Sequence, residues 1–272
     1  MTATHTSSAN RFQSALRRLR HDYFPGTRFS EPRQGIAVAH APHCNLTSTF
    51  QAVVSAADGG VRGHHALLRA ADAKGNAIEP LELFAHAGDG AAVASLDRLA
   101  RSLHAVNYFG GSAEEKRLFV GIDARMLAAA PDELGRYFDA LLATLGVPTS
   151  RIVECLGEAA LEDPVTFVRA CLAYAIRGYR VLAELRHDAH ADLEHVFLGD
   201  PHYVAIDASC LGDTACRQKV HAIVDALRQR GIQPVARRVE TQSHAEAARD
   251  MGFALLQGRY VAEPVLKPAL SG

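Results

Sequence analysis

The 272-residue sequence has no tryptophan and three methionines, and it has no long apolar run. Its longest apolar stretches fall well short of the ~18 residues that a membrane-spanning helix requires. The opening residues, MTATHTSSANRF, contain no apolar core of the kind found in a signal peptide. We therefore expect a cytoplasmic protein that makes no membrane contact.

The few cysteines give no sign of a disulfide framework or of a metal site. The chain has five cysteines, an odd number, namely Cys44, Cys155, Cys171, Cys210 and Cys216. They lie mostly within apolar segments and show none of the paired spacings typical of a metal site. We expect reduced thiols and no cofactor.

Neither sign of charge is in excess. Lys and Arg number 29, Asp and Glu number 30, and the formal net charge is −1. This balance gives no broad basic field for a nucleic-acid backbone, so we expect no direct nucleic-acid partner. The hydrophobic content of 48% is enough for one large core, and a single α/β barrel fits the length.

The first residues predict a helix that precedes the main domain. The segment RFQSALRRLRHDYF, residues 11–24, places Phe12, Leu16 and Leu19 at helical spacing with arginines between them. We expect these three side chains to pack on the domain, and a partner-binding helix is the alternative. Residues 25–45 show no regular period and are predicted to be irregular.

The second half repeats one unit, helix then glycine then strand, without repeating its sequence. The first copy, PDELGRYFDALLATLG, ends at Gly146 and leads into RIVECL, and three further copies follow. In the last copy, Ser243 and Glu246 have the spacing of a capping box. Such units build either a barrel or an open doubly wound sheet, and a count of about seven or eight strands favours the barrel.

The carboxyl ends of parallel strands are where a barrel carries its chemistry. The residues predicted near these ends are His65, Gly121, Glu154, Glu184, Leu185, Ala205, Asp207, Arg237, Arg238 and Gln257.

Six blocks containing these residues match one known family in order and spacing. They are GHHALLRA, LFVGIDARML, IVECLGEAAL, YVAID, PVARRVET and LLQGRYVAEPV. From about Thr47 to Pro264 the chain resembles an EAL domain, a barrel family whose active members hydrolyse cyclic di-GMP. We therefore expect a TIM-like (β/α) barrel of the EAL type at residues 47–268. Residues 1–46 are predicted to be an N-terminal extension with a short amphipathic helix.

The resemblance implies a two-metal hydrolytic site of which most parts are replaced. His65 stands at the Glu of the EAL motif, Gly121 at a metal-binding Asn, and Glu184 with Leu185 at an Asp pair. Ala205 stands at the assisting Lys and Arg237 at a further Glu. By the same alignment, Glu154 and Gln257 are retained. Gly121 and Leu185 offer no donor atom and Arg237 repels a cation, so we expect no hydrolysis.

The leading interpretation is a catalytically inactive EAL-type regulator that acts by binding another protein, as degenerate members of the family often do. The alternative is a receptor that binds cyclic di-GMP without cleaving it, and residual phosphodiesterase activity is a weaker alternative. The receptor would use residues that match the family's nucleotide groove or could meet a phosphate: Gln51, Leu67, Arg69, Arg237, Arg238, Glu240 and Gln257.

Two further hypotheses concern the old metal pocket. His65, Glu154, Glu184 and His187 could form a remodelled metal site, or His65 could simply fill space and hydrogen-bond Glu154. We also expect Arg237 to pair with Glu154, Glu184 or both, with a solvent-facing Arg237 as the alternative. The segment RHDAHADLEHV replaces the family's glycine-containing loop, so the family dimer is not assumed.

Overall fold

The strands form a closed barrel. The computed structural model describes residues 8–88, 90–110, 116–129, 135–186 and 193–268. In this part of the chain the strands join one 11-stranded sheet, and an additional pairing of β3 with β4 closes the ring. The barrel strands are β3 (Asn45–Ser55), β4 (Val61–Ala71), β6 (Arg117–Ile122), β7 (Ile152–Leu156), β8 (Arg180–Leu185), β9 (Tyr203–Asp207), β10 (Gln233–Arg237) and β11 (Leu255–Leu256). The predicted barrel is confirmed, and the open sheet is wrong.

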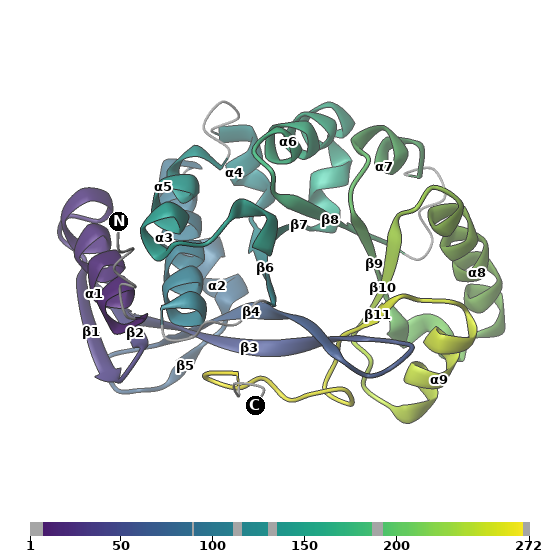
Figure 1. Cartoon of the computed structure of the whole chain (residues 1–272), viewed down its shortest axis with the longest axis horizontal. Helices are drawn as coiled ribbons and strands as arrows, with labels where there is room; N and C mark the ends of the chain where they lie inside the picture. The colour runs from purple at the N-terminus through teal and green to yellow at the C-terminus, as the bar shows by residue number, and fades with distance from the viewer. Residues whose placement is uncertain (1–7, 89, 111–115, 130–134, 187–192, 269–272) are drawn as a thin grey trace, which may run out of the picture.

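Helices surround the barrel on the outside (Figure 1). They are α2 (Pro80–His86), α3 (Gly90–Phe109), α4 (Ala124–Ala129), α5 (Arg136–Leu145), α6 (Pro164–Ile176), α7 (Leu193–Gly199), α8 (Thr214–Gln229) and α9 (Gln242–Asp250). The large core cluster lies between these helices and the strands, and a smaller cluster fills the barrel. Among the described helices, none combines the length and the apolar character needed to cross a bilayer.

The side of the barrel formed by β3 departs from the parallel pattern. Strand β3 runs antiparallel to both of its barrel neighbours, β4 and β11. Beyond β11 the chain turns back along β3, where the backbone N–H of Val265 donates to the carbonyl of Phe50 at 2.9 Å, and Phe50 donates in return. Figure 1 shows this C-terminal segment running beside β3. The C-terminal chain therefore extends the barrel wall.

The predicted N-terminal helix exists and packs on the domain. Helix α1 (Ser8–Arg18) continues into a π-helical turn, Leu19–Tyr23. Phe12, Leu16 and Leu19 are each at most 2% exposed, as predicted. Because this apolar face is already covered, it is not a free surface for a partner.

Residues 25–45, expected to be irregular, instead form most of a β-hairpin. Strands β1 (Arg28–Arg33) and β2 (Ile36–His40) pair antiparallel, and β2 also pairs with β3. The prediction failed because β1 is short, charged and interrupted by Pro32, which removes a ladder donor. A short β5 (Ala77–Ile78) adds to the other side of β4.

The predicted capping box of α9 is also wrong. The N-cap is Thr241, whose hydroxyl accepts from the backbone N–H of His244 at 3.2 Å. Ser243 already lies inside the first turn. The extended backbone of Thr241 permits this cap, which the spacing of Ser243 and Glu246 did not indicate.

Asn107 fastens the hairpin to the barrel. Its side-chain oxygen accepts from the N–H of Ala37 at 2.6 Å, and its amide donates to the Ala37 carbonyl at 3.1 Å and to Ser48 Oγ at 3.3 Å. Asn107 is 1% exposed. The buried backbone of β2 thus depends on one α3 side chain for these contacts.

We expect Asn107→Ala to lower the free energy of unfolding by about 2 kcal/mol, because it leaves the buried N–H of Ala37 without its partner and leaves the Ala37 carbonyl with only the Thr47 hydroxyl as donor. Urea unfolding followed by circular dichroism measures this change. The control is Asn76→Ala, which removes an exposed hydrogen bond to Asp72 and should change stability by less than about 0.5 kcal/mol. Equal effects of the two substitutions would contradict this role for Asn107.

Candidate functional site

Side-chain alternation along each strand decides which residues face the barrel interior. The interior cluster takes residues from one face of the strands. Its members are Val53, Phe119, Val153, Cys155, Leu182, Tyr203, Ala205, Val235 and Leu255. In β7 the inward side chains are therefore Val153 and Cys155, and Glu154 points outward, toward the helices.

This orientation corrects the predicted place of Glu154. Cys155, not Glu154, lies beside Gly121 at the carboxyl end of β7, since these two residues are partners in the β6–β7 ladder. The expected retention of Glu154 as a metal ligand is wrong.

Glu154 instead belongs to a buried ionic cluster against α3. The Arg101 guanidinium donates to Glu154 Oε1 at 3.0 Å and lies 3.6 Å from Asp97 Oδ2. All three side chains are at most 5% exposed. Arg101 also lies over the ring of Phe138, 4.8 Å from its centroid. One cation thus serves two carboxylates between the helix layer and the barrel.

Burial disfavours the charged forms of both carboxylates. It raises the pKa of Glu154 to about 7, against the opposing attraction of Arg101 and with a further increase from Asp97. It likewise raises the pKa of Asp97. Among the described residues, Glu154 Oε2 has no hydrogen-bond partner, which is consistent with a carboxyl group that readily takes up a proton.

Sequence reasoning missed this cluster. The i, i+4 spacing of Asp97 and Arg101 was visible and favours an ion pair on one helix face. Nothing in the sequence placed that face against β7. Side chains alternate along β7, so Glu154 faces outward once Val153 is known to face inward. The sequence alone did not show which of the two faces inward.

His65 lies inside the barrel mouth and contacts amides. Gln257 Nε2 lies 3.1 Å from His65 Nδ1 and donates to Gln51 Oε1 at 2.9 Å. Burial, and then the charge of Arg237, lower the pKa of His65 to about 3. The imidazole is therefore neutral at pH 7. The expected hydrogen bond to Glu154 is wrong, because Glu154 lies on the other side of the wall.

Arg237 forms an ion pair at the mouth. Its guanidinium donates to a Glu184 carboxylate oxygen, and each side chain is 26% exposed. The neighbouring Arg238 pairs with Asp207 at 3.0 Å and has a left-handed backbone, with φ of 54°. The predicted pairing of Arg237 with Glu184 is confirmed. Its pairing with Glu154 is wrong, because Arg101 takes that place.

These pairs line a small hollow of about 180 Å³. Its walls are Glu158, Glu184, Leu185, Ala205, Ile206, Asp207, Arg237 and Arg238. The side chain of Leu185 packs into the helix-facing core, while Ala205 faces inward. Neither can bind a cation.

A second hollow, of about 300 Å³, lies between β4 and α3. Its lining includes His65, Leu67, Arg69, Arg101 and Gly121. A Cβ atom at Gly121 would meet no heavy atom within 4 Å, so the missing side chain leaves open space here.

The predicted ligand residues are therefore only partly brought together. Leu67 and Arg69 line the second hollow, while Arg237 and Arg238 line the smaller one. Gln51 and Gln257 are buried beneath the mouth. Glu240 is exposed and belongs to neither hollow.

The proposed remodelled metal site is not assembled. Glu154 points to α3, Glu184 pairs with Arg237, and His65 contacts Gln257. His187, the fourth member, lies outside the described residues. In the part of the chain that the structure describes, no group of three or more His, Cys, Asp or Glu side chains could hold a metal ion.

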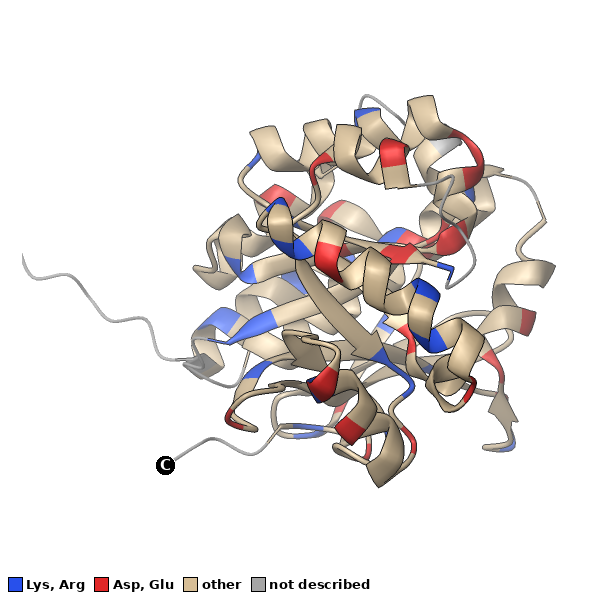
Figure 2. Ribbon diagram, turned by 90° about the vertical axis from the view of Figure 1, so that its right-hand side faces the viewer, with Lys and Arg blue, Asp and Glu red and all other residues tan. Residues whose placement is uncertain are grey.

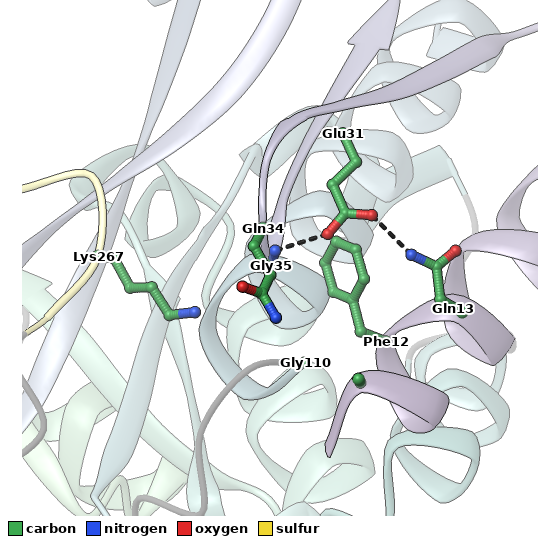
Figure 3. Close-up of a pocket in the computed structure, with 8 residues that line it drawn as sticks. Phe12, Gln13, Glu31, Gln34, Gly35, Gly110 and Lys267 are labelled. Carbon is green, nitrogen blue, oxygen red and sulfur yellow. Dashed lines mark hydrogen bonds between the residues drawn. The ribbon is translucent and has the colours of Figure 1, made fainter. Parts of the chain in front are cut away.

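A third hollow, of about 500 Å³, lies away from the mouth, beside the hairpin and α1 (Figure 3). Glu31 there accepts from Gly35 N at 2.7 Å and from Gln13 Nε2 at 2.6 Å. Lys267 lies across from these groups. The Glu31 carboxylate already accepts two hydrogen bonds within the chain, so we assign no ligand to this hollow.

The basic and acidic side chains of the folded protein are as evenly mixed as the balanced composition indicates. In the view of Figure 2, basic and acidic residues are interspersed. Pairs such as Arg62 with Asp58 and Arg125 with Asp123 neutralise many of them locally.

The raised pKa of Glu154 generates a pH prediction. The pKa of Glu154 is near 4.5 in the unfolded chain and about 7 in the folded protein. Between these two pH values the folded state binds more protons than the unfolded state. The contribution of Glu154 to stability is therefore greatest below about pH 4.5 and is lost as the pH rises through about 7. We expect Glu154→Gln to lose less stability than the parent between about pH 5 and pH 8, measured by urea unfolding. The exposed Glu162→Gln is the control, and identical slopes for Glu154→Gln and the parent would refute the assignment.

A second prediction concerns the Arg237–Glu184 pair. Because both side chains retain some exposure, we expect Arg237→Ala to cost about 1 kcal/mol, less than the ~3 kcal/mol of a dry pair. Denaturant unfolding measures this cost, with the exposed Arg259→Ala as control.

Manganese should leave the melting temperature of the unmodified protein unchanged, since the Arg237 guanidinium occupies the Glu184 carboxylate. A manganese-dependent rise would contradict this.

Comparison with solved structures supports the fold. The Bacillus subtilis YkuI protein with an EAL domain, in complex with c-di-GMP and calcium, has a TM-score of 0.72 at 19% identity, covering 83% of this chain and 56% of that one. The FimX EAL domain from Pseudomonas aeruginosa, bound to c-di-GMP, has a TM-score of 0.69 at 19% identity, and the match covers 81% of this chain and 91% of that one. Klebsiella pneumoniae BlrP1, in a manganese/cy-diGMP complex, has a TM-score of 0.68 at 21% identity, and the match covers 88% of this chain and 59% of that one.

This chain thus spans little more than half the length of the YkuI and BlrP1 chains. No curated protein matches its sequence. The family model of the EAL domain matches residues 37–264. This range begins within the hairpin and includes the whole barrel. With that match over most of its length, the chain belongs to the EAL domain family.

Proposed function

We propose that this chain is a catalytically inactive EAL domain that regulates by binding another protein. The observation that carries the proposal is the Arg237–Glu184 ion pair at the barrel mouth. A guanidinium bound to a carboxylate at the strand ends takes up the acceptor that a metal would need, and it repels an approaching cation.

The donor set at the mouth supports the same conclusion. Two-metal hydrolysis of a phosphodiester needs several oxygen ligands to hold both ions. The inward positions at this end present the Cys155 thiol, the Ala205 methyl group and a bare backbone at Gly121, and the carboxylates of Glu184 and Asp207 in the adjoining hollow are each paired with an arginine. Burial raises the pKa of Cys155 to about 12, so its thiol stays protonated and is a poor ligand. These residues do not fit a pair of divalent metals.

A second candidate function is a cyclic di-GMP receptor without turnover. The specific observation in its favour is the hollow of about 300 Å³, which places Leu67 and Arg69 beside the open space at Gly121. Solved structures of the same fold are described as bound to c-di-GMP. Against it, Arg237 and Arg238 are already paired with carboxylates, so neither is available to a phosphate without breaking an ion pair.

Incubation of the purified protein with cyclic di-GMP and manganese or magnesium tests the proposal. We expect no linear or mononucleotide product by liquid chromatography, because the inward donor set cannot hold two metals. His65→Glu should also remain inactive, since one restored carboxylate leaves Gly121, Ala205 and Arg237 in place.

The same samples separate the alternatives. Product above a metal-only control would overturn inactivity. Saturable heat in calorimetry, without product and lost in Arg69→Ala, would favour the receptor over the protein-binding module. Neither product nor heat is the outcome expected for the module.

A further inference from the structure

Two of the five cysteines lie close together where β9 leads into α8. Strand β9 ends at Asp207, a 3₁₀ turn spans Ala208–Gly212, and α8 begins at Thr214. Cys210 lies in the 3₁₀ turn and Cys216 in the first turn of α8. The other three cysteines lie elsewhere in the fold, before β3, on β7 and on α6. Among the five, Cys210 and Cys216 alone share one short segment.

Asp213 holds the backbones of both cysteines. Its N–H donates to the carbonyl of Cys210 at 3.0 Å, and its carboxylate accepts from the N–H of Cys216 at 2.7 Å. The two thiols lie within interaction distance of each other. The Cys210 thiol also donates to the carbonyl of Asp207 at 3.4 Å. A disulfide forms between sulfurs that the backbone already holds close, and this segment supplies that arrangement.

The two thiols differ in exposure, which sets the order in which they react. Cys210 is partly exposed, whereas Cys216 is only 9% exposed. A dissolved reagent therefore meets Cys210 first. Burial, and then the neighbouring Cys216 thiol, raise the pKa of Cys210 to about 12. Because the thiolate is the reactive form, the pair reacts slowly at neutral pH.

We propose that Cys210 and Cys216 form a reversible disulfide site, oxidised by a small disulfide such as glutathione disulfide. The Cys210 thiol loses its proton, attacks one sulfur of the small disulfide and expels the other sulfur as a thiolate, which takes up a proton. The Cys216 thiol then loses its proton, attacks Cys210 Sγ and expels the second small thiol. Two protein thiols thus give up two electrons and two protons, and one small disulfide becomes two thiols.

The site connects an outer helix to a wall of the barrel mouth. Asp207, directly before the turn, pairs with Arg238 and lines the smaller hollow. Oxidation removes the S–H that Cys210 donates to the Asp207 carbonyl and ties the turn to α8. The chemistry needs neither a metal nor cyclic di-GMP, so the inference stands or falls independently of the proposed function.

Peptide mapping of the full chain tests the site. The folded protein is incubated with glutathione disulfide at about pH 8.5, where more thiolate is present, and free thiols are then blocked in urea. Cleavage before Asp207, Asp213 and Asp225 releases residues 207–212 and 213–224, each with one of the two cysteines. We expect mass spectrometry to find these peptides joined, and to find them separate after reduction. The mapping uses the monomer band of a non-reducing gel, which excludes a bond between two chains.

Serine variants separate the two steps. Cys210→Ser and Cys216→Ser should each abolish the joined peptides, whereas the control Cys44→Ser should form them at the parent's rate. Because Cys210 is the more exposed thiol, Cys216→Ser should keep one glutathione on residues 207–212, and Cys210→Ser should leave residues 213–224 unmodified. Circular dichroism checks that each variant is folded.

Two results would overturn the proposal. One is a folded parent whose two peptides stay separate throughout the incubation. The other is Cys210→Ser carrying glutathione on Cys216 as readily as Cys216→Ser carries it on Cys210, because the order of attack then does not follow exposure.

Discussion

The two-residue period of the barrel strands is the constraint on which this molecule depends. On every strand it sends alternate side chains to the barrel interior or to the helix layer, so a shift of one position changes a residue's environment completely. In β7 it places the Cys155 thiol inside and the Glu154 carboxylate outside. A site that seems to keep an acidic ligand by sequence therefore presents a protonated thiol.

Charge in this barrel is balanced by arginine on both sides of the wall. Outside, Arg101 serves Asp97 and Glu154 in a dry layer where an unpaired carboxylate would be costly. At the mouth, Arg237 neutralises Glu184 in a partly wet setting. A guanidinium remains charged and hydrogen-bonds in a fixed plane, so it supplies the positive charge without depending on the supply of a metal. The fold retains carboxylates near its strand ends by these means.

The architecture could be predicted from sequence because each helix, glycine and strand unit carries its own local pattern. Gly146, for example, ends α5 in the left-handed conformation that its sequence position indicated. The hairpin at β1 and β2 was missed because Pro32 and the charged residues around it conceal the period of two. The pairing of Arg237 with Glu184 followed from their opposite charges and from their places at the same end of the barrel, on β10 and β8 with β9 between them. Arg101 could not be placed, since the contact between α3 and β7 depends on how two distant segments pack.

Closure of the ring has a consequence for synthesis on the ribosome. Strand β3, at residues 45–55, must find β11, at residues 255–256, and the later segment that pairs with Phe50. Strand β2 covers one end of this edge of β3 early, but most of the nascent polypeptide emerges before the rest of the edge is covered. Until that moment the edge is open to wrong strands, from this chain or from others. Its final partner is among the last parts of the domain to be translated, so the barrel cannot close before that segment has left the ribosomal tunnel.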